Sequence, residues 1–432
     1  MANISNESLD LHKGRYQVLA FLCLCALIAY VQRAALSVPA AEIASDLQFS
    51  DLARDMGRVQ SAWYLCYALM QLPSGWLADR IGSRRGLAIL SVAWSLATLL
   101  CVFAADFLSL LVLWGVMGAA QAGVFPCAIK ALGQIFPESE RARATGLLGS
   151  GTTIGGALAP VLAAVFLESL SPWAHALHID RWRLLLAAYA LPGMLWAVAF
   201  VTLISVQKLP AIERTSRVRS PVKWSRMLSS GSLALLCAQQ FFRAAGMVFF
   251  LTWFPTFLQK TRDVSSLNSG VLTTVAGAGG VLGSLTGGFF SDWLLERTGS
   301  LRLSRQGLAV AGLASCSLLI VSSYFLHDVN GSIALISLGV FCAAFGGIGG
   351  YTLAMSFGGR NVATVFSAMN MFGNLGAALF PVAAGWLVAQ TGNWNAMLFL
   401  FAGIMASAAV CWAFVNPQGT FFGDEDEAGH SH

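Results

Sequence analysis

Three basic residues stand inside long apolar stretches of this 432-residue chain: Arg33, Lys130 and Arg243. None of the 21 aspartates and glutamates, and none of the six histidines, falls near the middle of such a stretch. If the stretches cross a bilayer, an uncompensated charge near their middle costs about 2.5–3.5 kcal/mol. A guanidinium presents a planar fork that matches carboxylate or phosphate oxygens. Arg33 and Arg243 therefore predict anion binding, with a structural hydrogen bond as the alternative, whereas Lys130 can extend to the membrane surface or guide an anion.

Amide and tyrosine side chains in the same stretches offer hydrogen bonds suited to a hydroxylated anion. A buried amide needs a partner, which favours the glutamines and asparagines as ligand groups. A tyrosine within a helix bundle can equally be a packing residue. The predicted substrate-binding set comprises Arg33, Tyr30, Gln32, Tyr67, Gln121, Gln240, Arg243, Tyr351, Asn370 and Asn374.

Clusters that would support enzymatic or metal chemistry are missing from the sequence. No constellation of histidine, cysteine and carboxylate residues with the spacing of a catalytic or metal site lies within the apolar stretches or in one loop, so we predict no catalytic residues, no metal and no cofactor. The nine cysteines fall in apolar stretches and are expected as small apolar side chains without disulfides. The basic residues are dispersed among loops, which argues against a nucleic-acid partner.

The amino-acid composition requires that the apolar stretches be surrounded by an apolar solvent such as a lipid bilayer. Of all residues 56% are hydrophobic and only 11% are charged, against roughly a quarter charged in soluble domains. A membrane helix needs about 20 mostly apolar residues. Such stretches occupy residues 16–40, 57–79, 86–105, 107–136, 145–168, 183–206, 230–258, 268–291, 305–326, 333–357, 361–388 and 393–416.

These stretches predict an all-α membrane protein with twelve transmembrane helices in two six-helix bundles. The bundles would comprise residues 1–206 and 230–416, joined by a polar linker at 207–229 and followed by an acidic tail at 417–432. Lysine and arginine concentrate in the linker and in the loops on its side of the membrane, which places both termini in the cytoplasm. The first residues lack the features of a cleaved signal peptide, so the first stretch is expected to remain as a span in the inner membrane.

A loop motif occurs twice, once in each half. Gly75 and Asp79, followed by Arg80 and Arg84, recur 213 residues later as Gly288 and Asp292. Glycine allows two helices to approach closely, and the aspartate can bridge a neighbouring helix end and the basic turn. The alternative is that the charges only mark topology. We expect a conformational latch formed by Gly75, Asp79, Arg80, Arg84 and Asp292.

This motif resembles the signature loop of the major facilitator superfamily, and the resemblance covers the whole chain. Five further segments are similar to the anion–cation symporter family within it. They are Tyr30 to Pro39, Tyr67 to Gly75, Gly118 to Arg141, Phe250 to Leu258, and Gly358 to Gly376. The resemblance implies alternating-access transport of a sugar acid or another hydroxylated carboxylate. Because Arg33 and Arg243 are 210 residues apart, close to the motif repeat, we expect them to face each other across the pseudo-twofold axis of the two halves, near the membrane midplane.

The sequence departs from this family where the family couples transport to protons. Gln32 stands where the family has an aspartate, and Trp114 and Gln121 stand where it has an arginine and a glutamate. We therefore expect facilitated diffusion, anion exchange or sodium coupling. The alternatives are an organophosphate–phosphate exchanger of the same fold and a non-transporting membrane sensor or enzyme. The expected partners are a small organic anion, the lipid bilayer and, in a coupled mechanism, an ion; a monomer is expected.

Overall fold

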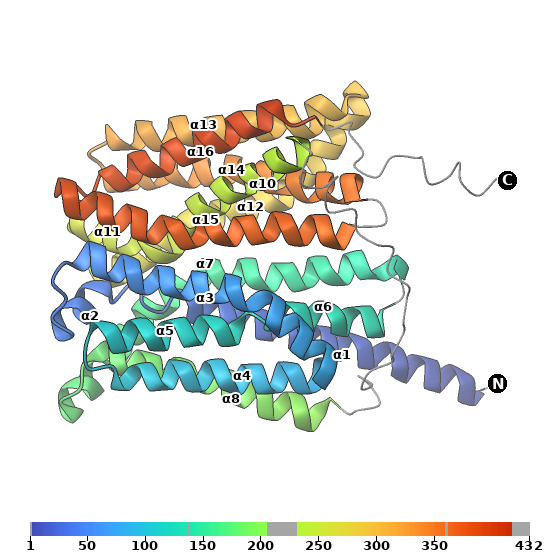
Figure 1. Cartoon of the computed structure of the whole chain (residues 1–432), viewed down its shortest axis with the longest axis horizontal. Coiled ribbons are helices and arrows are strands. Elements are labelled where there is room, and N and C mark those ends of the chain that lie inside the picture. The colour runs from blue at the N-terminus through green and yellow to red at the C-terminus, as the bar shows by residue number, and fades with distance from the viewer. Residues whose placement is uncertain (1, 137, 205–230, 359–361, 417–432) are drawn as a thin grey trace. The chain divides into compact units, whose positions relative to one another are not determined.

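Helices account for the secondary structure of the protein. The computed structural model describes residues 2–136, 138–204, 231–358 and 362–416, and within those ranges it contains helices and no strand (Figure 1). The predicted linker at 207–229 and the predicted acidic tail at 417–432 lie outside the described residues.

The helices before the linker are α1 (Ala2–Arg33), α2 (Ala40–Asp46), α3 (Leu52–Ile81), α4 (Ser83–Leu100), η1 (Cys101–Phe103), α5 (Phe107–Gln121), α6 (Val124–Ile135), α7 (Glu138–Leu177) and α8 (Arg181–Leu203). The helices after it are α10 (Gly231–Thr252), α11 (Phe254–Thr261), α12 (Ser266–Thr298), η2 (Arg302–Gly307), α13 (Leu308–Tyr324), α14 (Val329–Gly358), α15 (Val362–Thr391) and α16 (Ala396–Phe414).

The lengths and compositions of these helices suit a bilayer. Within the described ranges, 11 segments are long and apolar enough to cross a membrane. The remaining long helix is α3, which has 30 residues. Because a span needs about 20 residues, α3 completes the predicted set, and the all-α fold with twelve transmembrane helices is confirmed.

Three predicted spans are interrupted where one continuous helix was expected. The interrupted spans are 16–40, 107–136 and 230–258. In each case a second, shorter helix begins with a proline at its N-cap or within its first turn. Proline has no backbone N–H and its ring clashes with the carbonyl four residues earlier, but the first turn needs no intrahelical donor. Pro39, Pro126 and Pro255 thus stand where the shorter helices begin, at positions that proline tolerates.

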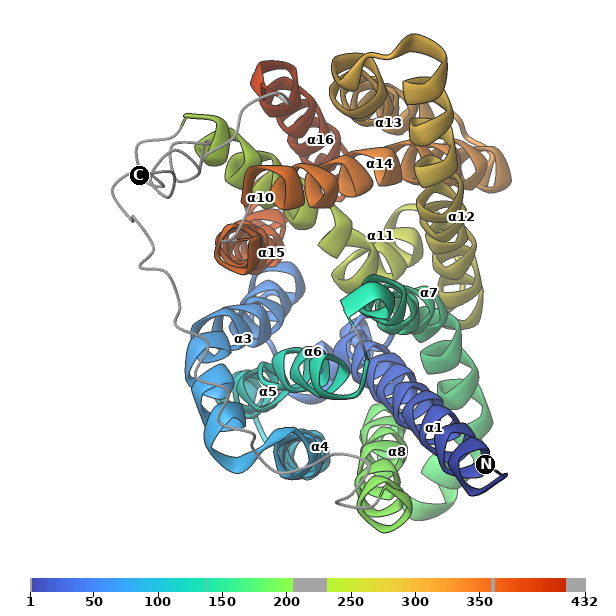
Figure 2. The same ribbon diagram turned by 90° about the vertical axis from the view of Figure 1, so that its right-hand side faces the viewer.

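Contacts divide the chain into two compact units. The first contains the helices from α1 to α8 together with Leu251–Gln259 and Asp263–Thr274, and the second contains the other described residues from α10 onward. In the first unit α1 packs against α7, α3 against α5, and α4 against α8 and α5; Figure 2 views several of these helices nearly end-on. In the second unit α13 packs against α14 and α16, and α14 packs against α15.

Buried aromatic residues form much of each core. In the first unit Trp196 stacks on Phe200 with ring centroids 4.6 Å apart, and its indole N–H donates to the Phe21 carbonyl at 2.8 Å. In the second unit Phe249 lies 5.4 Å from Phe401, again between ring centroids. Aromatic rings bury 150–250 Å² each and dominate such cores. The Trp196 hydrogen bond joins α8 to α1, which carries Arg33, and the Phe249–Phe401 contact joins α10 to α16.

Candidate anion-binding site

The site in the first unit begins where α1 ends. Arg33 is the last residue of α1, and the carbonyls of a helix's last turn have no intrahelical donors. Side chains of α11 satisfy the adjoining segment: Thr256 Oγ1 donates to the Ser37 carbonyl at 3.0 Å, and Gln259 Nε2 donates to the Val38 carbonyl at 3.2 Å. The carbonyls that follow the end of α1 therefore accept hydrogen bonds from a helix that is far away in the sequence.

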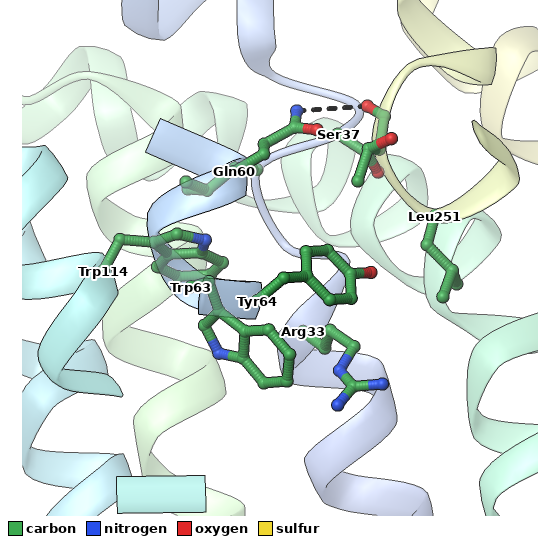
Figure 3. Close-up of a pocket in the computed structure, with 9 residues that line it drawn as sticks. Arg33, Ser37, Gln60, Trp63, Tyr64, Trp114 and Leu251 are labelled. Atoms are coloured by element: carbon green, nitrogen blue, oxygen red, sulfur yellow. Dashed lines mark hydrogen bonds between the residues drawn. The ribbon is translucent and has the colours of Figure 1, made fainter. Parts of the chain in front are cut away.

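Four aromatic rings surround the Arg33 guanidinium. Its Cζ lies 4.0 Å from the Trp63 ring centroid, 4.6 Å from Tyr30, 4.9 Å from Tyr67 and 5.4 Å from Tyr64. Figure 3 shows the guanidinium beside the rings of Trp63 and Tyr64. Among the described residues no carboxylate forms an ion pair with it. The cation is thus compensated by ring faces.

A small cavity adjoins the guanidinium. Arg33, Ser37, Gln60, Tyr64 and the Trp114 ring contribute to its lining, and its volume is about 10 Å³ (Figure 3). That is close to the least volume that holds one water molecule. Three buried polar atoms in this lining have no hydrogen-bond partner: Arg33 Nε, Gln60 Oε1 and the Tyr64 hydroxyl. An organic anion could reach these atoms only if lining side chains move apart.

Gln32 and Gln121, which stand where the family that the sequence resembles has carboxylates, both act as hydrogen-bond donors. Gln32 is buried, and its Nε2 donates to the Tyr189 carbonyl in α8. Gln121 is also buried, and its Nε2 donates to the Ala29 carbonyl at 3.3 Å. Each amide is therefore engaged with a backbone carbonyl of the same unit.

The structure brings together only part of the predicted set around Arg33. Tyr30 and Tyr67 lie against its guanidinium, whereas Gln32 is directed to α8. Sequence reasoning missed Trp63 and Tyr64. They precede Tyr67 on α3 by four and three residues, so all three lie on one helix face. That spacing is the signal that could have found them.

A second polar group lies in the other unit around Arg243. Its Nε and Nη2 donate to Gln240 Oε1 at 3.2 and 3.0 Å. Glycines leave room for this pair: a Cβ at Gly347 would lie 3.1 Å from Arg243 Nη1, and one at Gly373 would lie 3.0 Å from Gln240 Cγ. The unit therefore provides a guanidinium beside one glycine and a glutamine partner beside another.

The other predicted residues of this unit are placed as follows. Asn374 Nδ2 donates to the Asn370 carbonyl at 3.0 Å within α15, and both side chains are half-buried. The side chain of Tyr351 lies outside the described part of the chain. In the first unit Lys130 is half-buried on α6.

The predicted latch is only partly described. The side chains of Asp79 and Arg80, and the surroundings of Gly75, lie outside the described part of the chain. Arg84 caps the end of α8, because its Nε donates to the Ile204 carbonyl at 2.7 Å and its Nη2 donates to the Val201 carbonyl. A cation at this end also complements the helix dipole.

Replacing Arg84 with alanine is expected to destabilise the first unit. Loss of a charged cap at a helix C-terminus costs about 1 kcal/mol, and for a unit of this size that corresponds to a fall in Tm of about 2–4 °C. A thermal melt in detergent measures it. Arg85→Ala is the matched control, because Arg85 is the exposed neighbour with the same charge. Equal melting temperatures for the two variants would rule out the capping role.

In the second copy of the motif, Asp292 has a partner that the sequence analysis did not name. Arg305 Nη2 lies 2.7 Å from Asp292 Oδ1, and Arg305 Nη1 donates to Ser291 Oγ at 2.8 Å. Arg305 belongs to η2, a π-helical turn, and such turns often mark functional positions. The basic partner therefore comes from the following helix rather than from the loop itself.

Comparison with known proteins gives the family. Residues 22–336 match the model described as Major Facilitator Superfamily. A probable sulfoacetate transporter (SauU) of Cupriavidus necator is 29% identical, over 96% of this chain and 97% of its own. A probable galactarate/D-glucarate transporter (GudP) of Escherichia coli is 28% identical over 95% of each chain. The structure of a bacterial homologue of the human lysosomal transporter Spinster has a TM-score of 0.71 at 19% identity, covering 93% of this chain and 95% of that one.

The similar proteins that are named by function are transporters rather than enzymes, and their matches extend over nearly the whole chain. The fold agrees, since the described residues form long apolar helices in two compact units. The matched region of the family model covers well over half of the sequence. The protein is a multi-pass membrane transporter that belongs to the major facilitator superfamily.

Proposed function

We propose that the protein carries a small organic anion, a sugar acid or another small carboxylate, across the inner membrane by alternating access. The observation that supports this most strongly is Arg33, a cation at the end of a membrane helix with no carboxylate partner among the described residues. A cation within a membrane span that is not neutralised by a carboxylate favours an anionic ligand. The relatives named for sulfoacetate and for galactarate or glucarate handle small organic anions of this kind.

Within this proposal the residues have different roles. Arg33 binds a carboxylate of the substrate, and the hydroxyl groups of Tyr30 and Tyr67, which lie within reach of its guanidinium, offer further hydrogen bonds. Arg243 with Gln240 is a second candidate anion site in the other unit. Replacing the latch residues of the two loop motifs would slow the exchange between inward-facing and outward-facing states. Both termini would lie in the cytoplasm.

Transport would not depend on a titrating carboxylate at positions 32 and 121. A protonated carboxylic acid at either place would donate to the backbone carbonyl that the amide now engages. Glutamine therefore makes the same hydrogen bond as a protonated carboxylic acid, but it can neither release nor take up a proton. Facilitated diffusion or anion exchange agrees with this arrangement.

A ligand panel tests the proposal. The purified transporter in detergent is heated with galactarate, D-glucarate, sulfoacetate, an organophosphate such as glycerol 3-phosphate, and a neutral polyol of similar size. At 100 times its Kd a ligand stabilises the folded state by about 2.7 kcal/mol. We expect at least one carboxylate to raise the melting temperature and the polyol to have no effect. Equal stabilisation by the polyol would contradict an anion site, and selective stabilisation by the organophosphate would favour the exchanger function.

A further inference from the structure

The largest unassigned side chain next to Arg33 is Trp63. It is 1% exposed, and its ring centroid is the nearest of the four to the guanidinium, 4.0 Å from Cζ. A cation over an aromatic face gains up to about 2 kcal/mol when both groups are desolvated, and tryptophan gives the strongest attraction. Because Trp63 is the nearest ring and the most strongly attracting type, we infer that it contributes the largest share of the compensation of this half-buried charge.

Several contacts hold the indole of Trp63 in one orientation. Its Nε1–H donates to Met117 Sδ at 2.8 Å, and its ring stacks on Tyr67 with centroids 4.9 Å apart and planes 18° apart. Tyr64 packs edge-on at 4.9 Å. At Gly118 on α5 a Cβ would lie only 2.3 Å from the Trp63 carbonyl oxygen, so glycine permits this close approach of α5 to α3. The ring that faces Arg33 is thus fixed by two helices.

The kind of compensation matters for anion binding. A carboxylate partner would occupy the N–H donors of the guanidinium, because it binds in the plane of the fork. An aromatic ring attracts the cation through its face and leaves donors at the edge available. Arg33 Nε is in fact buried without a hydrogen-bond partner. A side chain held in its bound orientation also loses less entropy when the ligand arrives.

We propose that Trp63 is a positioning residue that holds the Arg33 guanidinium by its ring face and leaves its Nε–H donor free for the carboxylate of the substrate. This inference rests on the proposed function of Arg33 as the anion-binding group. It assigns to Trp63 a role in affinity that is separate from its contribution to packing.

Fluorinated tryptophans at position 63 test the role with almost no change of shape. Each added fluorine weakens the negative face of the indole, while its N–H becomes a better donor toward Met117. Substrate Kd is measured for tryptophan and its mono-, di-, tri- and tetrafluoro analogues, with the anion from the ligand panel that binds the wild type. We expect a progressive loss that reaches about tenfold for the tetrafluoro form, equivalent to 1.4 kcal/mol.

Trp196 provides the matched control, because it is a buried tryptophan of the same unit with a hydrogen-bonded N–H. The same fluorinated series at position 196 should leave Kd within about twofold of the wild type, a shift of about 0.4 kcal/mol. A graded loss at position 63 alone supports the proposal. A flat series at position 63, or an equal loss at position 196, overturns it.

A second measurement separates this proposal from the proposed function. Phenylglyoxal modifies arginine side chains, and mass spectrometry gives its rate at Arg33 in the absence of substrate. We expect Trp63→Leu to raise this rate severalfold while Trp63→Phe, which keeps a ring face, stays close to the wild type. If no anion binds the wild type, the proposed function fails, and this rate alone decides whether Trp63 holds Arg33. An unchanged rate in Trp63→Leu then overturns the positioning role.

Discussion

Arg33→Lys is expected to weaken anion binding by about 10–100-fold although the positive charge is kept. Hydrogen bonds to charged groups contribute about 1.5–3 kcal/mol, and each 1.4 kcal/mol is a factor of ten in Kd. Lysine offers a compact ammonium without the planar fork that matches a carboxylate. The ring of Trp63, now 4.0 Å from the guanidinium carbon, would also face a more strongly hydrated cation.

Isothermal titration calorimetry in detergent measures the effect, with thermal melts to confirm that the variant is folded. Arg58→Lys is the control, because Arg58 lies on the same helix as Trp63 but is half exposed beside Asp55. That variant should bind the anion like the wild type. If Arg33→Ala binds with undiminished affinity, Arg33 is not the anion-binding group.

Gln32→Asp is expected to make transport sensitive to a pH gradient that has no effect on the wild type. Gln32 lies next to Arg33 in the sequence, and its amide donates to the Tyr189 carbonyl. A carboxyl group at this position can take up and release a proton, whereas the amide cannot. A gradient of one pH unit supplies about 1.4 kcal/mol per proton, enough for about tenfold accumulation by a carrier that moves one proton with each substrate.

Uptake into proteoliposomes at zero membrane potential tests this expectation, with the substrate fully ionised on both sides. The wild type should equilibrate the anion without accumulating it. Gln32→Asn is the control, because it shortens the side chain like aspartate but adds no titratable group. Concentrative uptake by the wild type under the imposed gradient would show that proton coupling persists without a carboxylate at positions 32 and 121.

The helices and their apolar character could be predicted from sequence because they depend on local properties. A run of about 20 apolar residues has to be helical in a bilayer, since each helix satisfies its own backbone hydrogen bonds. The same reasoning singled out Arg33, Lys130 and Arg243, because a charged residue inside such a run can be recognised without knowing its neighbours in the fold. The helix starts at Pro39, Pro126 and Pro255 could also have been predicted from the proline positions. A search for apolar stretches alone does not detect them.

The directions of the polar side chains could not be predicted in this way. Gln32 and Arg33 are adjacent in the sequence, yet successive residues of a helix point about 100° apart, so one meets α8 and the other meets α3. Arg84 belongs to the recognised loop motif but caps α8, about 120 residues later. Asp292 likewise pairs with Arg305 of the next helical element.

By itself the sequence determined that this chain is a membrane protein of twelve helices, that it resembles a family of anion carriers, and that Arg33, Lys130 and Arg243 stand inside its apolar stretches. Only the tertiary structure decided what compensates the Arg33 guanidinium. Trp63, Tyr64 and Tyr67 reach it from α3, with the Trp63 ring fixed by Met117 of α5. The physical reason is that hydrophobicity and charge cost act along the chain, whereas ring faces and hydrogen-bond partners come from helices that meet only after packing.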